Sequence, residues 1–166
     1  PYAFLKEVGY GLLFLEPYDP AKTPVLFVYG AAGQARNWRP IFEGIDRSRF
    51  QPWFFNYPTG MPLEHSAGAL TGCLRQLHER FRFRHLFVVA HSMGGLVARR
   101  AIQKNLEAGA GEGLALFVSL STPWGGHWAA EKGVARAPAV VPSWRDIVPD
   151  SAFIRKALDP PLPPEL

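Results

Sequence analysis

The sequence predicts an α/β fold in which helices cover both faces of a mostly parallel sheet. Short unbroken apolar runs, bounded by glycine, proline or charge, are typical of strands that are covered on both faces, and such strands belong to parallel sheets. Segments with apolar residues at spacings of three and four separate these runs, so strands and helices alternate. With 166 residues, of which 48% are hydrophobic and 19% charged, the chain can bury one core without disulfides or metal.

Five segments are expected to be strands. Three of them are the unbroken apolar runs 25–29, 86–90 and 114–118. A fourth run, 53–57, lies between Pro52 and Pro58, an unusual setting for a strand inside a sheet. A shorter apolar run at 12–15 suits an edge strand.

The helical patterns lie between and after these strands. The longest runs from Leu63 to Phe81 and carries one apolar stripe, which we expect to pack on the sheet. A second helix is expected from about Gly94 to Leu106, and a third, short helix from Ser151 to Leu158. The loop-like stretch 124–127 separates the last two.

A net charge of +4 raises the question of nucleic-acid binding. The strongest candidate is Arg80-Phe81-Arg82-Phe83-Arg84, where basic and aromatic side chains alternate as they do in single-strand-binding sheets. This stretch directly follows a helical pattern and precedes a buried strand, and cations near a helix C-terminus complement the helix dipole. We therefore interpret it as a helix end and expect no nucleic-acid partner.

The sequence indicates no cofactor and no metal. Cys73 is the single cysteine, and no Cys/His cluster has the spacing of zinc ligands. Gly9-Tyr10-Gly11 lacks the third glycine of the dinucleotide-binding fingerprint. No apolar run approaches the roughly 18 residues of a membrane span. These observations leave the compartment and the oligomeric state undetermined.

Ser92 lies where a buried strand is expected to pass directly into a helix, in Ala90-His91-Ser92-Met93-Gly94-Gly95. A nucleophile on such a turn has a strained backbone, and small residues two positions away on each side let strand and helix approach. Ala90 and Gly94 meet this need. The hydroxyl is then exposed at a helix N-terminus, where N–H groups face a developing negative charge.

This stretch resembles the α/β-hydrolase superfamily in its lipase and esterase branch, including bacterial lipases and GPI-inositol-deacylase-like relatives. The family pattern is G-x-S-x-G; Ala90 stands at its first position, a variant that small bacterial lipases of the family also have. The resemblance covers roughly residues 20–158. It implies that Ser92 is the nucleophile and that the Met93 N–H is one donor of the oxyanion hole.

A second stretch, Tyr29-Gly30-Ala31-Ala32-Gly33, is similar to the family's H-G-x-x-G-like oxyanion loop. The resemblance implies the Ala31 N–H as the other oxyanion donor. Tyr29 stands where the family usually has His, a departure that changes loop packing but not the backbone donor. Each stretch follows an expected strand, and one strand–helix unit separates the two.

The triad's acid and histidine are not evident in this sequence. In the family the chain order is Ser, acid, His, and only His127 follows Ser92. Glu107 and Glu112 fall at a helix end and in a turn, whereas Asp146 and Asp150 come after His127. The resemblance implies that the chain stops after the family's sixth strand. We therefore expect residues 1–166 to be a single domain, incomplete at its C-terminus and its N-terminus, with little activity alone.

Other chemistry-bearing residues have more ordinary interpretations. Trp124 and His127 are candidate pocket residues, and His127 is the one candidate for a surrogate base. The stretch around Asp146 is similar to one in the family's relatives, and this resemblance implies a structural role for Asp146 in pairing or capping. His91 is expected to point away from the nucleophile and to pack in the core, and Cys73 to be a packed side chain.

The sequence thus favours a serine hydrolase that cleaves carboxylic, lipid-like esters through an acyl-enzyme on Ser92. The expected partner is a small-molecule or lipid ester, and contact with a membrane surface is compatible with such a substrate. Thioesterases and acyltransferases use the same scaffold and are alternatives. A non-catalytic binding domain that keeps the hydrolase scaffold is a further alternative, of a different class.

Overall fold

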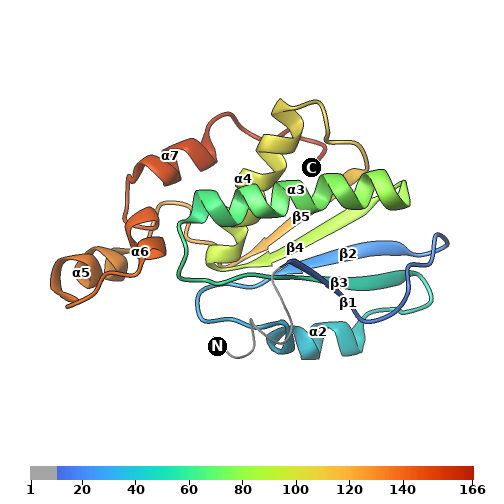
Figure 1. Cartoon of the computed structure of the whole chain (residues 1–166), viewed down its shortest axis with the longest axis horizontal. Coiled ribbons are helices and arrows are strands. Elements are labelled where there is room, and N and C mark those ends of the chain that lie inside the picture. The colour runs from blue at the N-terminus through green and yellow to red at the C-terminus, as the bar shows by residue number, and fades with distance from the viewer. Residues whose placement is uncertain (1–10) are drawn as a thin grey trace.

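The computed structural model describes residues 11–166 (Figure 1). Within this range five strands form one sheet in the order β1-β3-β2-β4-β5. Their bounds are β1 Gly11–Phe14, β2 Thr23–Val28, β3 Phe50–Asn56, β4 Leu86–His91 and β5 Leu114–Leu120. Strands β2 to β5 run parallel, and β1 pairs antiparallel with β3 at one edge. The mostly parallel sheet is confirmed. The resemblance implied that the chain stops after the family's sixth strand, and the described residues form five strands.

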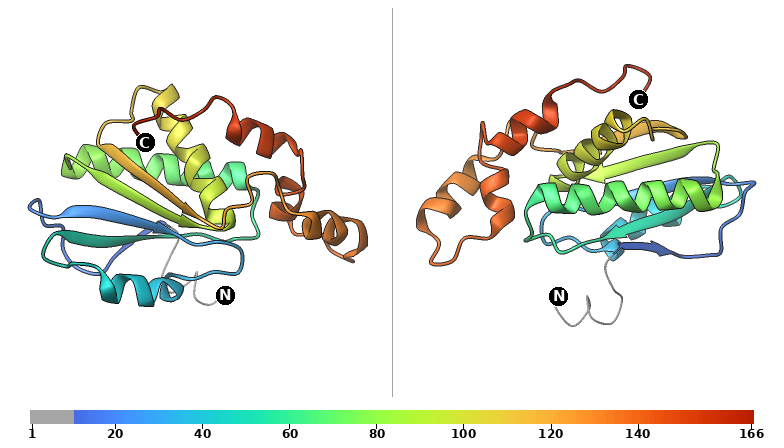
Figure 2. Two further views of the ribbon diagram at one scale, coloured as in Figure 1. Left: turned by 180° about the vertical axis from the view of Figure 1, so that it is seen from behind. Right: turned by 45° about the horizontal axis from the view of Figure 1, so that its top comes forward.

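Helices cover both faces of this sheet, as expected. Figures 1 and 2 show α3 and α4 over one face and α2 under the other. The bounds are η1 Ala35–Trp38, α2 Arg39–Gly44, α3 Leu63–Phe81, α4 Met93–Glu107, α5 Trp128–Arg136, α6 Pro142–Asp146 and α7 Ala152–Leu158. Helices α3, α4 and α7 confirm the three helical patterns. The short helices η1, α2, α5 and α6 were not expected, because none of them carries a long apolar stripe.

Strand β3 lies between β1 and β2 despite the two prolines that flank its core-forming run. Its side chains Trp53, Phe54 and Phe55 are buried. Strand β1 pairs only with residues 53–56, so Pro52 has a single neighbouring strand, β2. A residue without an N–H is tolerated there because one side of the strand needs no ladder hydrogen bond at that position.

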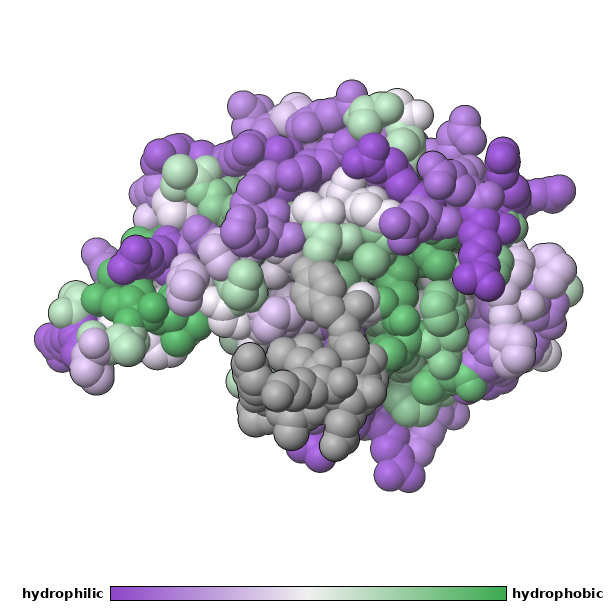
Figure 3. All heavy atoms as spheres, viewed as in Figure 1, coloured by the Kyte–Doolittle hydropathy of each residue, from purple (hydrophilic) through white to green (hydrophobic). Residues whose placement is uncertain are grey.

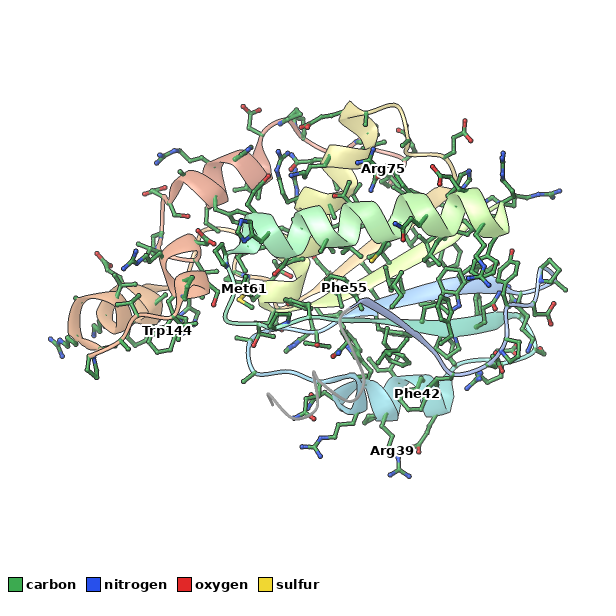
Figure 4. All side chains as sticks on the ribbon, in the orientation of Figure 1. Arg39, Phe42, Phe55, Met61, Arg75 and Trp144 are labelled. Carbon is green, nitrogen blue, oxygen red and sulfur yellow. The ribbon has the colours of Figure 1, made fainter. Side chains whose placement is uncertain are left out.

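The two sheet faces are filled by side chains from the covering helices. On the α3 face the stripe predicted from the sequence is buried, with Leu63, Ala67 and Leu70 fully enclosed. On the other face Phe42 of α2 meets Phe54 edge to face at 5.6 Å (Figure 4). The core is therefore continuous through the sheet, and it holds the carboxyl ends of β2 and β4 in fixed positions.

Asp146 ties the C-terminal region to α3. Its Oδ2 accepts a hydrogen bond of 2.6 Å from the Leu63 N–H, the first amide of the helix. This confirms the structural role expected for Asp146, since a carboxylate satisfies an unpaired amide and complements the helix dipole. Burial raises the pKa of Asp146, and the Leu63 N–H, a smaller influence, acts in the opposite direction.

The α5–α6 unit projects from the body beyond the carboxyl ends of the strands (Figures 1 and 2). Hydrophobic surface is visible on it in Figure 3, and the Trp128 side chain is 63% exposed with Lys132 Nζ 4.7 Å above its ring. No helix within residues 11–166 combines the length and apolar character needed to cross a bilayer.

Strand β5 forms the other edge of the described sheet. Its residues Leu116 and Leu120 are 39% and 38% exposed. The edge is not wholly free, because the Phe117 N–H donates to the Leu166 carbonyl at 3.2 Å. The C-terminal residues thus cover part of β5.

We predict that Asp146→Asn changes the pH dependence of stability. The raised pKa means that the folded state binds the Asp146 proton more tightly than the unfolded state, so this group favours folding below the ordinary Asp pKa. That contribution is lost as pH rises through the pKa of the folded state. Asn cannot titrate but can still accept from Leu63. Urea unfolding of both proteins from about pH 3 to pH 7 is expected to show wild type losing stability relative to Asp146→Asn as pH rises; a constant difference would contradict the assignment.

Candidate active site

Ser92 occupies a strained turn between β4 and α4. Its backbone angles are φ 53° and ψ −133°, a region that non-glycine residues rarely adopt. The Ser92 N–H donates to the Leu120 carbonyl at 2.8 Å, which attaches the turn to the end of β5. The strained backbone that the sequence predicted is present. Its side chain does not cap α4 and is partly exposed.

Small residues around Ser92 are required by close contacts with a neighbouring backbone and a neighbouring side chain. A Cβ on Gly94 would lie 2.4 Å from the Tyr29 carbonyl oxygen and 2.6 Å from that of Val28. A Cβ on Gly95 would lie 1.9 Å from Thr122 Oγ1. Ala90 is fully buried. The first turn of α4 therefore packs directly on the end of β2, which leaves no space for side chains.

The loop after β2 touches the Ser92 turn. A Cβ on Gly30 would lie 2.7 Å from Ser92 Cβ and 3.1 Å from Ser92 Oγ, so Gly30 permits this contact. The Gly33 N–H donates to the Gly30 carbonyl at 3.0 Å and closes a turn in which Ala32 has φ 53°. The Ala32 N–H donates to Thr59 Oγ1 at 3.1 Å. The loop thus has a defined conformation against the hydroxyl-bearing turn.

Two backbone N–H groups near Ser92 have no hydrogen-bond acceptor among the described residues. The Ala31 N–H is one, since its loop neighbours Ala32 and Gly33 use theirs within the loop or on Thr59. The Met93 N–H is the other, because Met93 begins α4 and the first amide of a helix has no intrahelical acceptor. Both amides belong to the two segments that meet at Gly30 and Ser92.

Two stacked tyrosines hold the beginning of this loop. The Tyr57 hydroxyl donates to the Tyr29 carbonyl at 2.6 Å, while the Tyr29 hydroxyl donates to Asn56 Oδ1 at 2.8 Å. The rings of Tyr29 and Tyr57 stack with centroids 5.0 Å apart. Burial raises the pKa of Tyr29, so its phenol stays protonated and can donate. Tyr29 is therefore part of a buried clamp at the start of this loop.

Ser92 opens into a hollow of about 350 Å³. Its walls come from the β2 loop, from η1 and α2, and from the ends of β4 and β5. The lining residues are Tyr29, Gly30, Ala31, Ala32, Gly33, Asn37, Trp38, Ile41, His91, Ser92 and Leu120. Asn37, Ile41 and Leu120 were not identified from the sequence. Leu120 lies two residues beyond the predicted strand 114–118, at the end of the observed β5, and could have been found, whereas Asn37 and Ile41 lie on helices with no clear pattern.

His91 is not in the core, and the sequence-based expectation for it was wrong. Its side chain is exposed, lines the Ser92 hollow and meets Trp38 edge to face at 6.4 Å. Side chains along β4 alternate between more and less buried, and His91 falls where the strand ends beyond the covering layers. The residue before the serine thus belongs to the wall of the hollow.

Trp124 and His127 do not line this hollow. His127 caps α5, where its Nδ1 accepts from the Ala129 N–H at 3.2 Å, and it lines a separate hollow beside Trp144. Trp124 packs edge to face on Phe117 at 6.4 Å. These contacts give His127 a structural role and place no base at Ser92.

No histidine or carboxylate within residues 11–166 hydrogen-bonds the Ser92 hydroxyl. Glu107 Oε1 pairs with Arg100 Nη1 at 3.1 Å, and Glu112 Oε2 lies 3.3 Å from His78 Nε2. Both acids thus form ion pairs away from the strand ends, as their expected positions at a helix end and in a turn implied. The same range holds no cluster of three or more His, Cys, Asp and Glu side chains suited to a metal ion.

Comparisons with known proteins agree with this architecture. Residues 70–147 match a family model described as "Putative serine esterase (DUF676)". The mature form of the Bacillus licheniformis lipase BlEst2 superposes with a TM-score of 0.69 at 19% identity, over 87% of this chain and 62% of that chain. No curated protein gives a significant sequence match.

Two further solved structures show the same fold. Lipase B of Aspergillus fumigatus has a TM-score of 0.65 at 13% identity, covering 87% of this chain and 36% of that chain. Phospholipase PlaB of Legionella pneumophila has a TM-score of 0.60 at 14% identity, covering 82% and 34%. The chain therefore has the α/β-hydrolase fold of lipases and esterases, and it spans about three fifths of the length of BlEst2.

We predict that Gly94→Ala strongly destabilises the protein. The added methyl group would overlap two backbone carbonyl oxygens that cannot rotate away, and overpacking of this kind costs about 1–3 kcal/mol or more. Gly72→Ala is the matched control, because a Cβ on Gly72, inside α3, meets nothing within 4 Å. The control is expected to gain roughly 0.5–1 kcal/mol of helix stability. Denaturant unfolding of both variants tests this, and equal effects would rule out the close contact.

Proposed function

We propose that this chain, with its hydrolase fold, carries the nucleophile and oxyanion hole of a serine hydrolase that cleaves carboxylic esters. The observation that supports it most is the contact between the strained Ser92 turn and the Gly30 loop. This contact brings a partly exposed hydroxyl close to two segments that each have an unpartnered backbone N–H. A single oxyanion donor is worth about 3 kcal/mol of barrier lowering, so the pair of amides matters as much as any side chain.

In this proposal Ser92 Oγ attacks the ester carbonyl carbon and forms a tetrahedral adduct. The negative oxygen of the adduct accepts hydrogen bonds from the Ala31 and Met93 N–H groups. The adduct collapses to an acyl-enzyme as the alcohol leaves, and water then releases the acid. The N-terminal position of Met93 in α4 adds the favourable end of the helix dipole.

The hollow suits an ester with an apolar acyl part. Trp38, Ile41 and Leu120 contribute apolar surface beside Ser92, and Ile41 and Leu120 are 44% and 38% exposed. A lipid-like ester is therefore the proposed substrate. The exposed Trp128 and Lys132 on α5 suit contact with a lipid surface that supplies such a substrate.

Ser92 also needs a base. In this proposal the acid and histidine of the triad lie outside residues 1–166. The chain spans about three fifths of BlEst2, and no described histidine bonds the Ser92 hydroxyl. Loss of triad partners costs about 10⁴ to 10⁶ in turnover. The 166-residue chain alone is accordingly expected to hydrolyse esters very slowly.

One observation favours a second candidate, a non-catalytic binding domain on the hydrolase scaffold. It is that no base contacts Ser92 within the described residues. The coding sequence that follows Leu166 discriminates between the two: an Asp or Glu after another apolar strand, and then a His, favours the enzyme. The strained backbone at Ser92 argues against the binding domain, because a domain that only binds has no need of that strain.

We predict that a fluorophosphonate probe labels the protein at Ser92. The oxyanion amides stabilise the phosphoryl oxygen of the adduct, so labelling occurs even though it is slow without a base. Ser92→Ala is expected to abolish labelling, measured by intact mass and peptide mapping. Ser48→Ala, a change at an exposed and remote serine, is expected to retain it. Labelling that survives Ser92→Ala would reject Ser92 as nucleophile.

We further predict that Tyr57→Phe slows this labelling. The change removes the hydroxyl that holds the Tyr29 carbonyl at 2.6 Å and so frees the peptide leading to Ala31. Loss of a buried hydrogen bond costs about 1–3 kcal/mol of stability, and we expect labelling at least about tenfold slower. Thr71→Val deletes another buried hydroxyl, which bonds the Ala67 carbonyl at 2.8 Å within α3, and serves as the control. Equal labelling rates in the two variants would show that Tyr57 does not position the loop.

A further inference from the structure

A second groove lies at the opposite end of the strands from Ser92. It runs between the segment that precedes β2 and the segment that links α3 to β4, at the end of the molecule where α3 ends in Figure 1. Its volume is about 490 Å³. Ser92 follows the carboxyl end of β4, whereas this groove adjoins the amino ends of β2 and β4. The two sites are therefore separated by the length of the strands.

The groove is lined by basic side chains and no carboxylate. Lys22, Arg82, Arg84 and His85 all contribute to it, together with Tyr18 and Thr23. The nearby Asp19 does not line it, and its Oδ1 accepts from the Ala21 N–H at 2.9 Å. Positive side chains thus converge on a concave surface whose own lining includes no acidic residue.

The two arginines of this groove lack carboxylate partners among the described residues. The Arg82 Nε donates to the Glu79 carbonyl at 3.3 Å, and this bond leaves both Nη groups for other acceptors. Arg84 makes no ion pair within residues 11–166, and Lys22 has a long one to Glu16 at 3.7 Å. By contrast Arg100 bonds both Glu64 and Glu107. The groove therefore has cationic donors that no described acid satisfies.

Packing of the alternating phenylalanines fixes these arginines in place. Phe83 is buried and meets Trp53 edge to face at 5.9 Å, while Phe81 stacks on Tyr18 at 4.3 Å. Arg82 has φ 48°, and its N–H donates to the His78 carbonyl at 2.8 Å. The aromatic residues of the Arg-Phe-Arg-Phe-Arg stretch are thus anchors, and the arginines project to solvent from a fixed backbone.

We propose that this groove binds a phosphate group of a small molecule or of a lipid headgroup. A planar guanidinium presents parallel N–H donors that match phosphate oxygens, and such charge-assisted bonds are about twice as strong as neutral ones. The dipole of α3 accounts for Arg82, whose Nε donates to a carbonyl of the last turn, whereas no hydrogen bond joins the side chain of Arg84 or Lys22 to that helix within residues 11–166. The short concave groove suits a compact phosphate better than an extended nucleic-acid strand.

Isothermal titration of the 166-residue protein with inorganic pyrophosphate, at low and constant ionic strength, tests this proposal. Saturable binding is expected, and Arg84→Gln and Lys22→Gln are each expected to weaken it about tenfold. Arg75→Gln removes the same charge from an exposed position on α3 (Figure 4) and is expected to leave the affinity unchanged. Amide shifts in NMR spectra during the titration are expected at the non-proline residues of 18–23 and at 81–85.

The outcomes separate the proposal from its alternatives. Absence of saturable binding, or an equal loss in Arg75→Gln, would overturn it, since the latter indicates unspecific charge attraction. Tighter binding of a single-stranded oligonucleotide than of pyrophosphate, lost in Arg84→Gln, would also overturn it in favour of nucleic acid. Binding to vesicles with phosphatidylinositol phosphate but not to phosphatidylcholine vesicles would identify a lipid headgroup, and pyrophosphate binding without vesicle binding a soluble ligand.

Discussion

The packing of the first turn of α4 against the end of β2 determines the geometry of the candidate site. Backbone carbonyl oxygens of Val28 and Tyr29 occupy the space where a side chain at Gly94 would be. That contact sets the distance between β2 and the turn after β4, and so it also brings Gly30 against Ser92. The strain at Ser92 is maintained because the β4 strand, the α4 helix and the Leu120 carbonyl fix the residues on both sides of it.

The tyrosine clamp extends this constraint to the neighbouring strand. Tyr57 follows β3 and Tyr29 follows β2, so their stacked rings and reciprocal hydrogen bonds join two parallel strands where both end. Buried hydroxyls are costly unless they are paired, and each of these donates to an oxygen at 3.0 Å or less. The loop that follows Tyr29 thus begins from a rigid point, as the proposed oxyanion site would require for preorganisation.

The two ends of the sheet have different chemistry. The carboxyl ends carry Ser92, small residues and an apolar wall, whereas the amino ends carry Lys22 and the arginines that follow α3. The carboxyl ends of parallel strands lie together at one end of a sheet and their amino ends at the other, so residues distant in sequence gather at each end. One chain of +4 net charge can therefore hold an apolar hollow and a basic groove that do not interfere.

The sequence by itself determined the strands, three of the helices (α3, α4 and α7) and the strained serine, because hydrophobic period and small residues are local signals. It also indicated that Asp146 is structural. Tertiary structure decided what depends on contacts between distant segments: the exposure of His91, the separation of His127 from Ser92, and the Asn37 and Ile41 wall. Contacts between distant segments also decided that Tyr57 holds the Tyr29 loop and that Lys22 lies beside Arg84. Side chains at different strand ends meet only when the sheet forms, and no local pattern records which of them become neighbours.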